Sequence, residues 1–388
     1  MYSTVHKLKK FAEDAYLDTK YTEDEVADLV RNEAERLINM EFRSIKGAPP
    51  TLRTELFLYT GKMFNCSERF DDEAKRFLTF TVTENPTLFD GWLELGLCVA
   101  KQNDITFAVE CFERSIKIAR SPKGLANLAI ALRLKASLSK DENVQKNLRS
   151  RAFRLLKEAV ESDKNLGLAH LTLGTHYFSE FFTSYQSMKN LLDEACASYE
   201  NALKCEDQKG NPELHLNYAT TLRYCEQFFK SIIHLKEACR LDPRNSLNSK
   251  EKFNNLTLYL EKLNEMVHRQ GRLKSKRVEM FAESLKAGTC PPNASVVKVI
   301  GTVTHEEIVP LTLGCILPTG KCCAVTVYNC STDFGFVIGD TLTIANPEWK
   351  MYENIKMCRV NSPNQLLRNG QPVAANAIAH ATLKIEQS

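Results

Sequence analysis

Three charged residues are the side chains best suited to hold a ligand. Arg133, Glu213 and Arg223 are predicted to stand apart on an otherwise apolar surface. A guanidinium can hold a carboxylate through two parallel hydrogen bonds, and a carboxylate can accept the same bonds from an arginine. A peptide with charges of both signs would suit this set. The alternative, that these charges pair with one another or with water, stays open.

A second candidate for chemistry is a short basic segment. The run RQGRLKSKR places five cations close together: Arg269, Arg272, Lys274, Lys276 and Arg277. Such a cluster can contact phosphates locally. The alternatives are a solvated helix end or a weak nuclear-import patch.

Catalytic patterns are missing from the sequence. It has no GxGxxG, no GK[ST] loop, no GxSxG elbow and no HExxH. The acidic clusters Asp71-Asp72-Glu73 and Asp141-Glu142 are best explained as solvated positions. We therefore predict a binding protein that is not an enzyme and uses no cofactor or metal. An enzyme hidden near the C-terminus is the least favoured alternative.

Composition points to an intracellular globular chain. There are 51 Lys and Arg against 48 Asp and Glu, a formal charge of +3, so any nucleic-acid contact must be local. The 13 cysteines form no CxxC pair, and Cys322-Cys323 would point to opposite faces of a strand. We expect reduced core thiols. We expect no signal peptide and no membrane span.

A repeat explains how the charged residues are positioned. Trp92, Leu95, Gly96 and Val99, followed by Ala108 and Phe112, fit the tetratricopeptide (TPR) helix pair, in which a small residue lets two helices cross closely. Gly61 lies 35 residues before Gly96, close to the TPR period of about 34. Related units centre on Ala129, Gly174 and Ala219, and the spacings between these three are 45 residues. The extra residues are expected between the paired helices.

The repeat register places the charges on the inner surface. Counting from the small residue of each first helix, Arg133, Glu213 and Arg223 fall at positions that line the groove of a TPR array. The sequence therefore predicts an exposed peptide groove with isolated charges.

Flanking segments complete four predicted parts. Residues 1–50 are predicted as N-terminal helices, 51–245 as about five repeats, two of them with insertions, and 246–287 as one capping helix. From 288 to 388 the hydrophobic period falls to about two, which predicts roughly five short strands over 295–305, 308–317, 324–328, 335–344 and 374–385. The predicted fold is an all-α TPR superhelix followed by a small all-β OB-fold barrel. Such barrels often bind single-stranded nucleic acid, but aromatic and basic residues are sparse here.

The chain resembles one family over nearly its whole length. The most specific stretches are Asn211–Asn217 (NPELHLN), the HRQGRLKSKR segment, Ala324–Asn329 (AVTVYN) and Phe334–Asp340 (FGFVIGD). They resemble the tetratricopeptide repeat protein 5 (Strap) family, whose members carry a TPR array followed by an OB-fold.

The resemblance implies a role in tubulin autoregulation. The family recognises the Met-Arg-Glu opening of nascent tubulin at the ribosome and triggers tubulin mRNA decay through an adaptor and a deadenylase complex. By position, Arg133 matches the arginine that reads the peptide's Glu. Glu213 stands where the family often has an Asp that contacts the peptide's Arg. The longer Glu side chain keeps the charge but shifts the position of the carboxylate. Asn217 and Arg223 match groove supports less closely.

The resemblance also implies other contacts and an alternative function. Lys274 and Lys276, with neighbouring Arg272 and Arg277, match cations that contact the ribosome, through ribosomal RNA phosphates or ribosomal proteins. The family is also described as a nuclear stress-response transcription coactivator that joins a histone acetyltransferase complex. The implied location is both cytoplasm and nucleus, and the residues do not separate the two functions.

Overall fold

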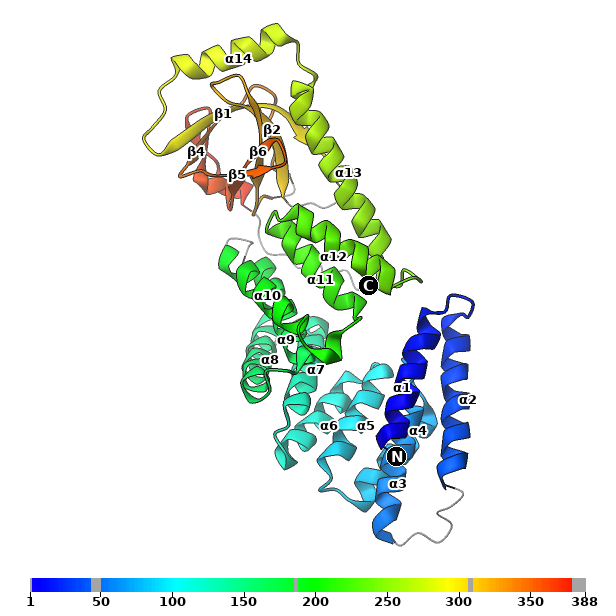
Figure 1. Ribbon diagram of the computed structural model, residues 1–388. Helices are drawn as coiled ribbons and strands as arrows, with labels where there is room; N and C mark the ends of the chain where they lie inside the picture. The colour runs from blue at the N-terminus through cyan, green and yellow to red at the C-terminus, as the bar shows by residue number, and fades with distance from the viewer. Residues whose placement is uncertain (1, 43–49, 185–187, 306–309, 332, 379–388) are drawn as a thin grey trace. The chain divides into compact units, whose positions relative to one another are not determined.

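A computed structural model describes residues 2–42, 50–184, 188–305, 310–331 and 333–378 (Figure 1). The chain divides into two compact units. The array unit comprises Met1–Gly174, Ser198–Leu214 and Arg240–Ser246. The barrel unit comprises Thr175–Ala197, His215–Cys239 and Leu247–Ser388. Within the described ranges, no helix is both long and apolar enough to cross a membrane.

The array unit begins with two helices, α1 (Tyr2–Leu17) and α2 (Glu23–Phe42). Helix α2 starts at a capping box: the Glu25 carboxylate accepts from the Thr22 backbone N–H at 2.7 Å, and the Thr22 hydroxyl accepts from Glu25 N–H at 3.3 Å. Leu8, Val30 and Ala34 are buried between these helices and the next one. The N-terminal segment is therefore part of the folded array unit.

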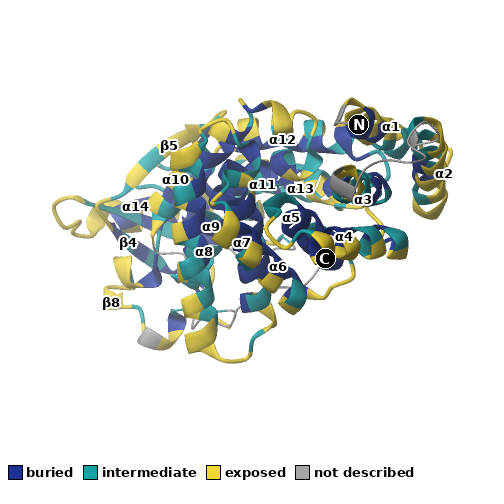
Figure 2. Ribbon diagram, turned by 90° about the horizontal axis from the view of Figure 1, so that it is seen from below, coloured by how far each residue is buried: buried dark blue, intermediate teal, exposed yellow. Residues whose placement is uncertain are grey.

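Helix pairs follow along the chain, and each of the first six of these helices packs against its neighbour in sequence (Figure 1). Their bounds are α3 (Pro50–Phe64), α4 (Asp72–Glu84), α5 (Phe89–Lys101), α6 (Ile105–Ile118), α7 (Pro122–Leu138), α8 (Glu142–Ser162), α9 (Gly167–Thr183), α10 (Lys189–Ala202), α11 (Pro212–Tyr224) and α12 (Phe228–Leu241). The unit boundary passes through α9 to α12. Helix α8 has 21 residues, so the insertion before it lengthens a helix. Figure 2 shows the inward faces of α5, α6 and α7 as buried.

The acidic clusters noted in the sequence start helices. Asp71 accepts hydrogen bonds from the backbone N–H groups of Glu73 at 2.8 Å and Ala74 at 3.2 Å. Asp141 caps α8 in the same way. An N-cap carboxylate satisfies N–H groups that lack a partner inside the helix. These two aspartates therefore have structural roles.

Glycine lets the paired helices approach closely. A Cβ at Gly96 would lie 2.5 Å from the Phe112 ring, and a Cβ at Gly174 would lie 2.7 Å from the Tyr199 ring. No side chain fits in that space. The contacts match the TPR pattern in the sequence, in which a small residue on the first helix meets a large one on the second.

The single helix expected over 246–287 is two helices, α13 (Ser249–His268) and α14 (Ser275–Ala287). The chain turns between them through Gln270, Gly271 and Arg272, whose φ angles are 49°, 64° and 60°. A Cβ at Gly271 would lie 2.5 Å from the carbonyl oxygen of Ile300, so only glycine fits. The packing of this turn on the first strand ends the helix that the apolar period alone would continue.

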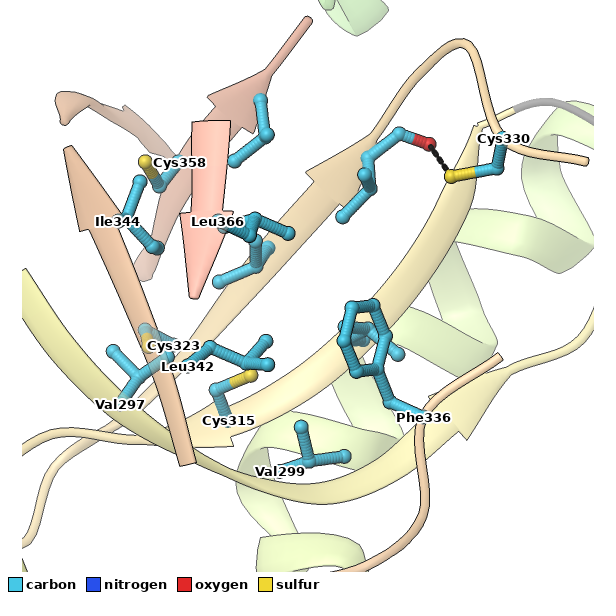
Figure 3. Close-up of a cluster of buried hydrophobic side chains, with 14 residues drawn as sticks. Val297, Val299, Cys315, Cys323, Cys330, Phe336, Leu342, Ile344, Cys358 and Leu366 are labelled. Atoms are coloured by element: carbon cyan, nitrogen blue, oxygen red, sulfur yellow. Dashed lines mark hydrogen bonds between the residues drawn. The ribbon is translucent and has the colours of Figure 1, made fainter. Parts of the chain in front are cut away.

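The described part of the barrel has eight strands: β1 (Ala294–Val303), β2 (Leu311–Ile316), β3 (Cys322–Val327), β4 (Thr341–Ala345), β5 (Glu348–Tyr352), β6 (Ile355–Val360), β7 (Leu366–Arg368) and β8 (Gln371–Pro372). Their order is β5-β6-β3-β2-β1-β4-β7-β8, antiparallel except for β3 with β6. Figure 3 shows the apolar interior, which includes Val297, Cys315, Leu342 and Cys358. Helix α13 covers the outer face through Leu256, Tyr259, Leu260 and Leu263.

The strand predictions are partly wrong. A strand expected at 374–385 is absent from its described part, where 375–377 form a short 3-10 turn, and 379–388 lie outside the described residues. The prediction missed β5 to β8. It placed Cys322 and Cys323 on opposite faces correctly, because Cys323 lies in the barrel interior and Cys322 packs near α14.

Candidate functional site

Arg133 lies half-buried near the C-terminal end of α7. Its Nη1 donates to the carbonyl oxygen of Thr172 on α9, at 3.4 Å. Helices α7 and α9 are the first helices of successive pairs, and these helices line the inner surface of a TPR array. The guanidinium therefore reaches from one first helix to the next, and its place in a peptide groove stays a prediction.

Glu213 lies exposed in the first turn of α11. Asn211 accepts hydrogen bonds from the backbone N–H groups of Glu213 at 2.9 Å and Leu214 at 3.4 Å, which fixes the start of the helix. A carboxylate is favoured there by the helix dipole. Arg133 and Glu213 both belong to the array unit.

The array unit also holds a chain of charges that sequence reasoning missed. Lys62 on α3 contacts Asp90 at 2.8 Å and Glu94 at 3.8 Å on α5, and Lys123 on α7 contacts Glu94 at 3.8 Å. Burial acts to lower the pKa of Lys62, but Glu94 and Asp90 outweigh it and the pKa is raised. All four residues are on first helices. Their repeat positions were the signal that could have identified them.

Asn217 and Arg223 belong to the barrel unit. Asn217 is half-buried, and its backbone carbonyl oxygen accepts from the Thr221 hydroxyl at 2.9 Å. Arg223 is only 8% exposed, and its guanidinium carbon lies 5.7 Å from the centre of the Tyr259 ring. This cation–π contact fixes the arginine against α13.

Arg223 lines a cavity of about 240 Å³. Its walls come from α11, α13 and the end of β1, and its other lining residues are Asn255, Leu258, Tyr259, Lys262, Thr304 and His305. Lys262 Nζ also donates to the Thr304 carbonyl at 3.1 Å. With an arginine, a lysine and a histidine around it, this cavity suits an anionic group.

The last helix pair and the barrel are joined by buried polar contacts within the barrel unit. Glu226, in the turn after α11, accepts from the hydroxyls of Thr326 at 2.5 Å and Tyr328 at 3.3 Å. Arg359 on β6 donates to the Tyr224 carbonyl and lies over the Tyr328 ring, 3.6 Å from its centre. Burial first, and then the Glu226 charge, raise the pKa of Tyr328 well above its ordinary value. No motif or spacing in the sequence indicates this cluster.

The basic segment forms the turn and the start of α14. Arg272 is ion-paired with Glu265 at 2.9 Å, and the Arg277 guanidinium lies 5.4 Å from the Phe281 ring. Lys274 and Lys276 are exposed, and neither has an ion-pair partner in the described part of the chain. These two lysines are therefore the most available cations of the segment. The described residues contain no group of three or more His, Cys, Asp or Glu that could hold a metal.

Taken together, the paired helices with glycine contacts and the terminal barrel define a helical-repeat binding protein with an OB-type domain. Residues 273–382 match the family model described as the tetratricopeptide repeat protein 5 OB fold domain. The chain is 27% identical over 415 residues to human tetratricopeptide repeat protein 5, covering 95% of this chain and 92% of the human one. The bovine protein of that name is 28% identical over 369 residues, covering 85% and 83%.

Among solved structures, a thermophilic TPR protein of Thermus thermophilus aligns with 53% of this chain and 99% of its own, at 20% identity and a TM-score of 0.44. The resemblance of the chain to the tetratricopeptide repeat protein 5 family is confirmed by the family model and the curated relatives. This similarity and the paired helices of the array support an adaptor or scaffold, which acts by binding along its repeats.

Proposed function

We propose that this protein recognises the N-terminal Met-Arg-Glu peptide of nascent tubulin at the ribosome and promotes tubulin mRNA decay. It would act in the cytoplasm as an adaptor, without chemistry of its own, and pass the signal to a second adaptor and a deadenylase complex. The similarity to tetratricopeptide repeat protein 5 over 95% of the chain supports the proposal.

The observation that carries the proposal is the placement of Arg133. Its guanidinium is half-buried and reaches the neighbouring first helix. Partial burial strengthens its attraction to a carboxylate, because water screens the charges less there. We assign it to the Glu of the peptide. Glu213, exposed at the start of α11, is assigned to the peptide's Arg.

Asn217 and Arg223 are assigned supporting roles. Arg223 is held by Tyr259 at the edge of the cationic cavity. A fixed guanidinium loses little side-chain entropy on binding.

The ribosome contact is assigned to the basic segment. Lys274 and Lys276 are exposed at the start of α14, with Arg272 and Arg277 beside them. Exposed lysines without ion-pair partners can approach phosphates without first breaking a contact.

The test measures binding of a Met-Arg-Glu peptide to the full chain. Arg133→Ala should weaken binding about 10- to 100-fold, because a charged hydrogen-bonded pair contributes about 1.5–3 kcal/mol. A peptide with Gln in place of Glu should show little further loss on Arg133→Ala.

The matched control is Arg151→Ala. Arg151 pairs with Glu113 at 2.7 Å between the second helices α8 and α6, and both side chains are 42% exposed. This control should bind the peptide normally. Equal affinity for Arg133→Ala and the unchanged protein would remove the assignment and favour the nuclear coactivator scaffold instead.

A further inference from the structure

Two cysteines from different helix pairs meet in the barrel unit. Cys196 on α10 and Cys225, just after α11, have their sulfur atoms 3.8 Å apart. Cys196 is half-buried, whereas Cys225 is 5% exposed and packs among Phe181, Leu192, Tyr224 and Tyr328. In the sequence, 28 residues separate the two cysteines, and the fold brings them together.

The electrostatic surroundings of Cys225 differ from those of three buried or half-buried cysteines of the array unit. Burial raises the pKa of Cys66 and Cys98 to about 11 and that of Cys111 to about 12. The pKa of Cys225 is lowered, first by the hydrogen bond with Cys196 and also by the charge of Arg359, against the effect of burial. Lys189 acts in the same direction as Arg359, and Asp193 opposes them.

Arg359 is well placed for this effect. Its guanidinium is held by the Tyr224 carbonyl and the Tyr328 ring, and both tyrosines belong to the buried cluster that includes Cys225. Its buried Nη2 has no hydrogen-bond partner among the described atoms. A cation fixed near a thiol favours the thiolate, which is the form that reacts with peroxides.

We propose that Cys196 and Cys225 form an oxidisable dithiol, which hydrogen peroxide converts into a reversible disulfide. The Cys225 thiolate attacks one peroxide oxygen and breaks the O–O bond. With one proton taken up, this gives a sulfenic acid at Cys225 and one water. The Cys196 sulfur then displaces the sulfenic oxygen as a second water and forms the S–S bond. Two thiols are oxidised by two electrons, and one peroxide is reduced to two waters.

The sulfur atoms must approach from 3.8 Å to the bonded distance of about 2.05 Å. The disulfide would tie α10 to the turn that carries Glu226, which joins the last helix pair to the barrel. Oxidation is therefore expected to stabilise the barrel unit, because a cross-link restricts the unfolded chain.

The experiment exposes the full-length reduced protein to limiting hydrogen peroxide, blocks remaining thiols with N-ethylmaleimide and maps the cysteines by mass spectrometry. Cys196 and Cys225 should lose their thiols first and appear in one cross-linked peptide that dithiothreitol separates. The thermal midpoint should rise on oxidation and return on reduction. Cys290 is exposed and serves as the accessible reference thiol.

Two variants make the test sharper. In the Cys196→Ser protein, Cys225 should form a sulfenic acid that dimedone traps. In the Cys225→Ser protein, peroxide should oxidise Cys196 no faster than it oxidises Cys290. The proposal is wrong if Cys290 is oxidised before the pair, or if Cys225 pairs with another cysteine. It is also wrong if Cys225 gives no dimedone adduct in a Cys196→Ser protein whose cooperative thermal transition shows that it is folded.

Discussion

Charged side chains differ between the two units in their exposure and in the groups that they contact. In the array unit, exposed charges pair from one helix to the next, as Arg151 on α8 does with Glu113 on α6. In the barrel unit, Glu226 and Arg359 are placed between a helix pair and a sheet and contact hydroxyl, carbonyl and aromatic groups. Exposed charges can exchange partners for a ligand, whereas buried ones stabilise a single arrangement.

Packing differs in the same way. The array unit repeats one local packing contact, in which a glycine of one helix faces an aromatic ring of the paired helix, at Gly96 and Gly174. The barrel unit depends on contacts between distant segments, such as Gly271 against Ile300. Mutations that add volume should therefore be costly at both kinds of contact, since a Cβ would meet its neighbour at 2.5 Å at Gly96 and at Gly271.

The largest expected effect is at Gly96. Gly96→Val would place a Cβ 2.5 Å from the Phe112 ring in the middle of α5, and we expect a loss of about 3 kcal/mol in the free energy of unfolding. Urea denaturation of the full chain measures it. Gly335→Ala is the control, since nothing lies within 4 Å of its Cβ, and should change stability by less than about 0.5 kcal/mol. Equal losses in the free energy of unfolding for Gly96→Val and Gly335→Ala would contradict the packing described for the array.

A smaller effect is expected at Glu226. Glu226→Ala removes the carboxylate that accepts from the Thr326 and Tyr328 hydroxyls and leaves them longer contacts of 3.4 Å with the carbonyl oxygens of Cys358 and Tyr224. A hydrogen bond to a charged group contributes about 1.5–3 kcal/mol, so we expect a loss of that order in the free energy of unfolding. The matched change is Glu158→Ala, which breaks the surface pair with Arg120 and should cost less than about 1 kcal/mol. A larger loss at Glu158 than at Glu226 would reverse the comparison between the units.

The smallest effect on stability is expected at the basic segment, where the consequence is for binding. Lys274→Glu with Lys276→Glu should leave the free energy of unfolding within about 0.5 kcal/mol, because both side chains are exposed. Co-sedimentation with ribosomes should fall, and its salt slope should decrease by about 2.

The control for that change is Lys321→Glu with Lys350→Glu, which reverses two exposed charges elsewhere on the barrel unit. It should keep ribosome binding. A similar loss in both double variants would mean that net charge alone attracts the ribosome.

The repeat register was predictable because it is local. The spacing of Gly61, Gly96 and Gly174 and the residues around them indicated the helix pairs, and the contacts of Gly96 with Phe112 follow that pattern. The same register placed Arg133 on the surface of the first helices. Caps such as Asp71 and Thr22 also act within one helical turn.

The barrel was less predictable because its strands are short and pair with distant partners. β6 lies parallel to β3, and neither its length nor its alternation marks it in the sequence. The break between α13 and α14 depends on the Ile300 carbonyl, which a helical period does not reveal.

The sequence by itself determined the class of protein, the helix pairs and the likeness to one family, since these depend on spacing within about 35 residues. Only the tertiary structure decided which groups meet across longer separations. Arg359 reaches Tyr224, and Thr326 reaches Glu226, through contacts between elements that are far apart in the chain. The physical reason is that burial and the field of neighbouring charges depend on three-dimensional packing, which no spacing in the sequence records.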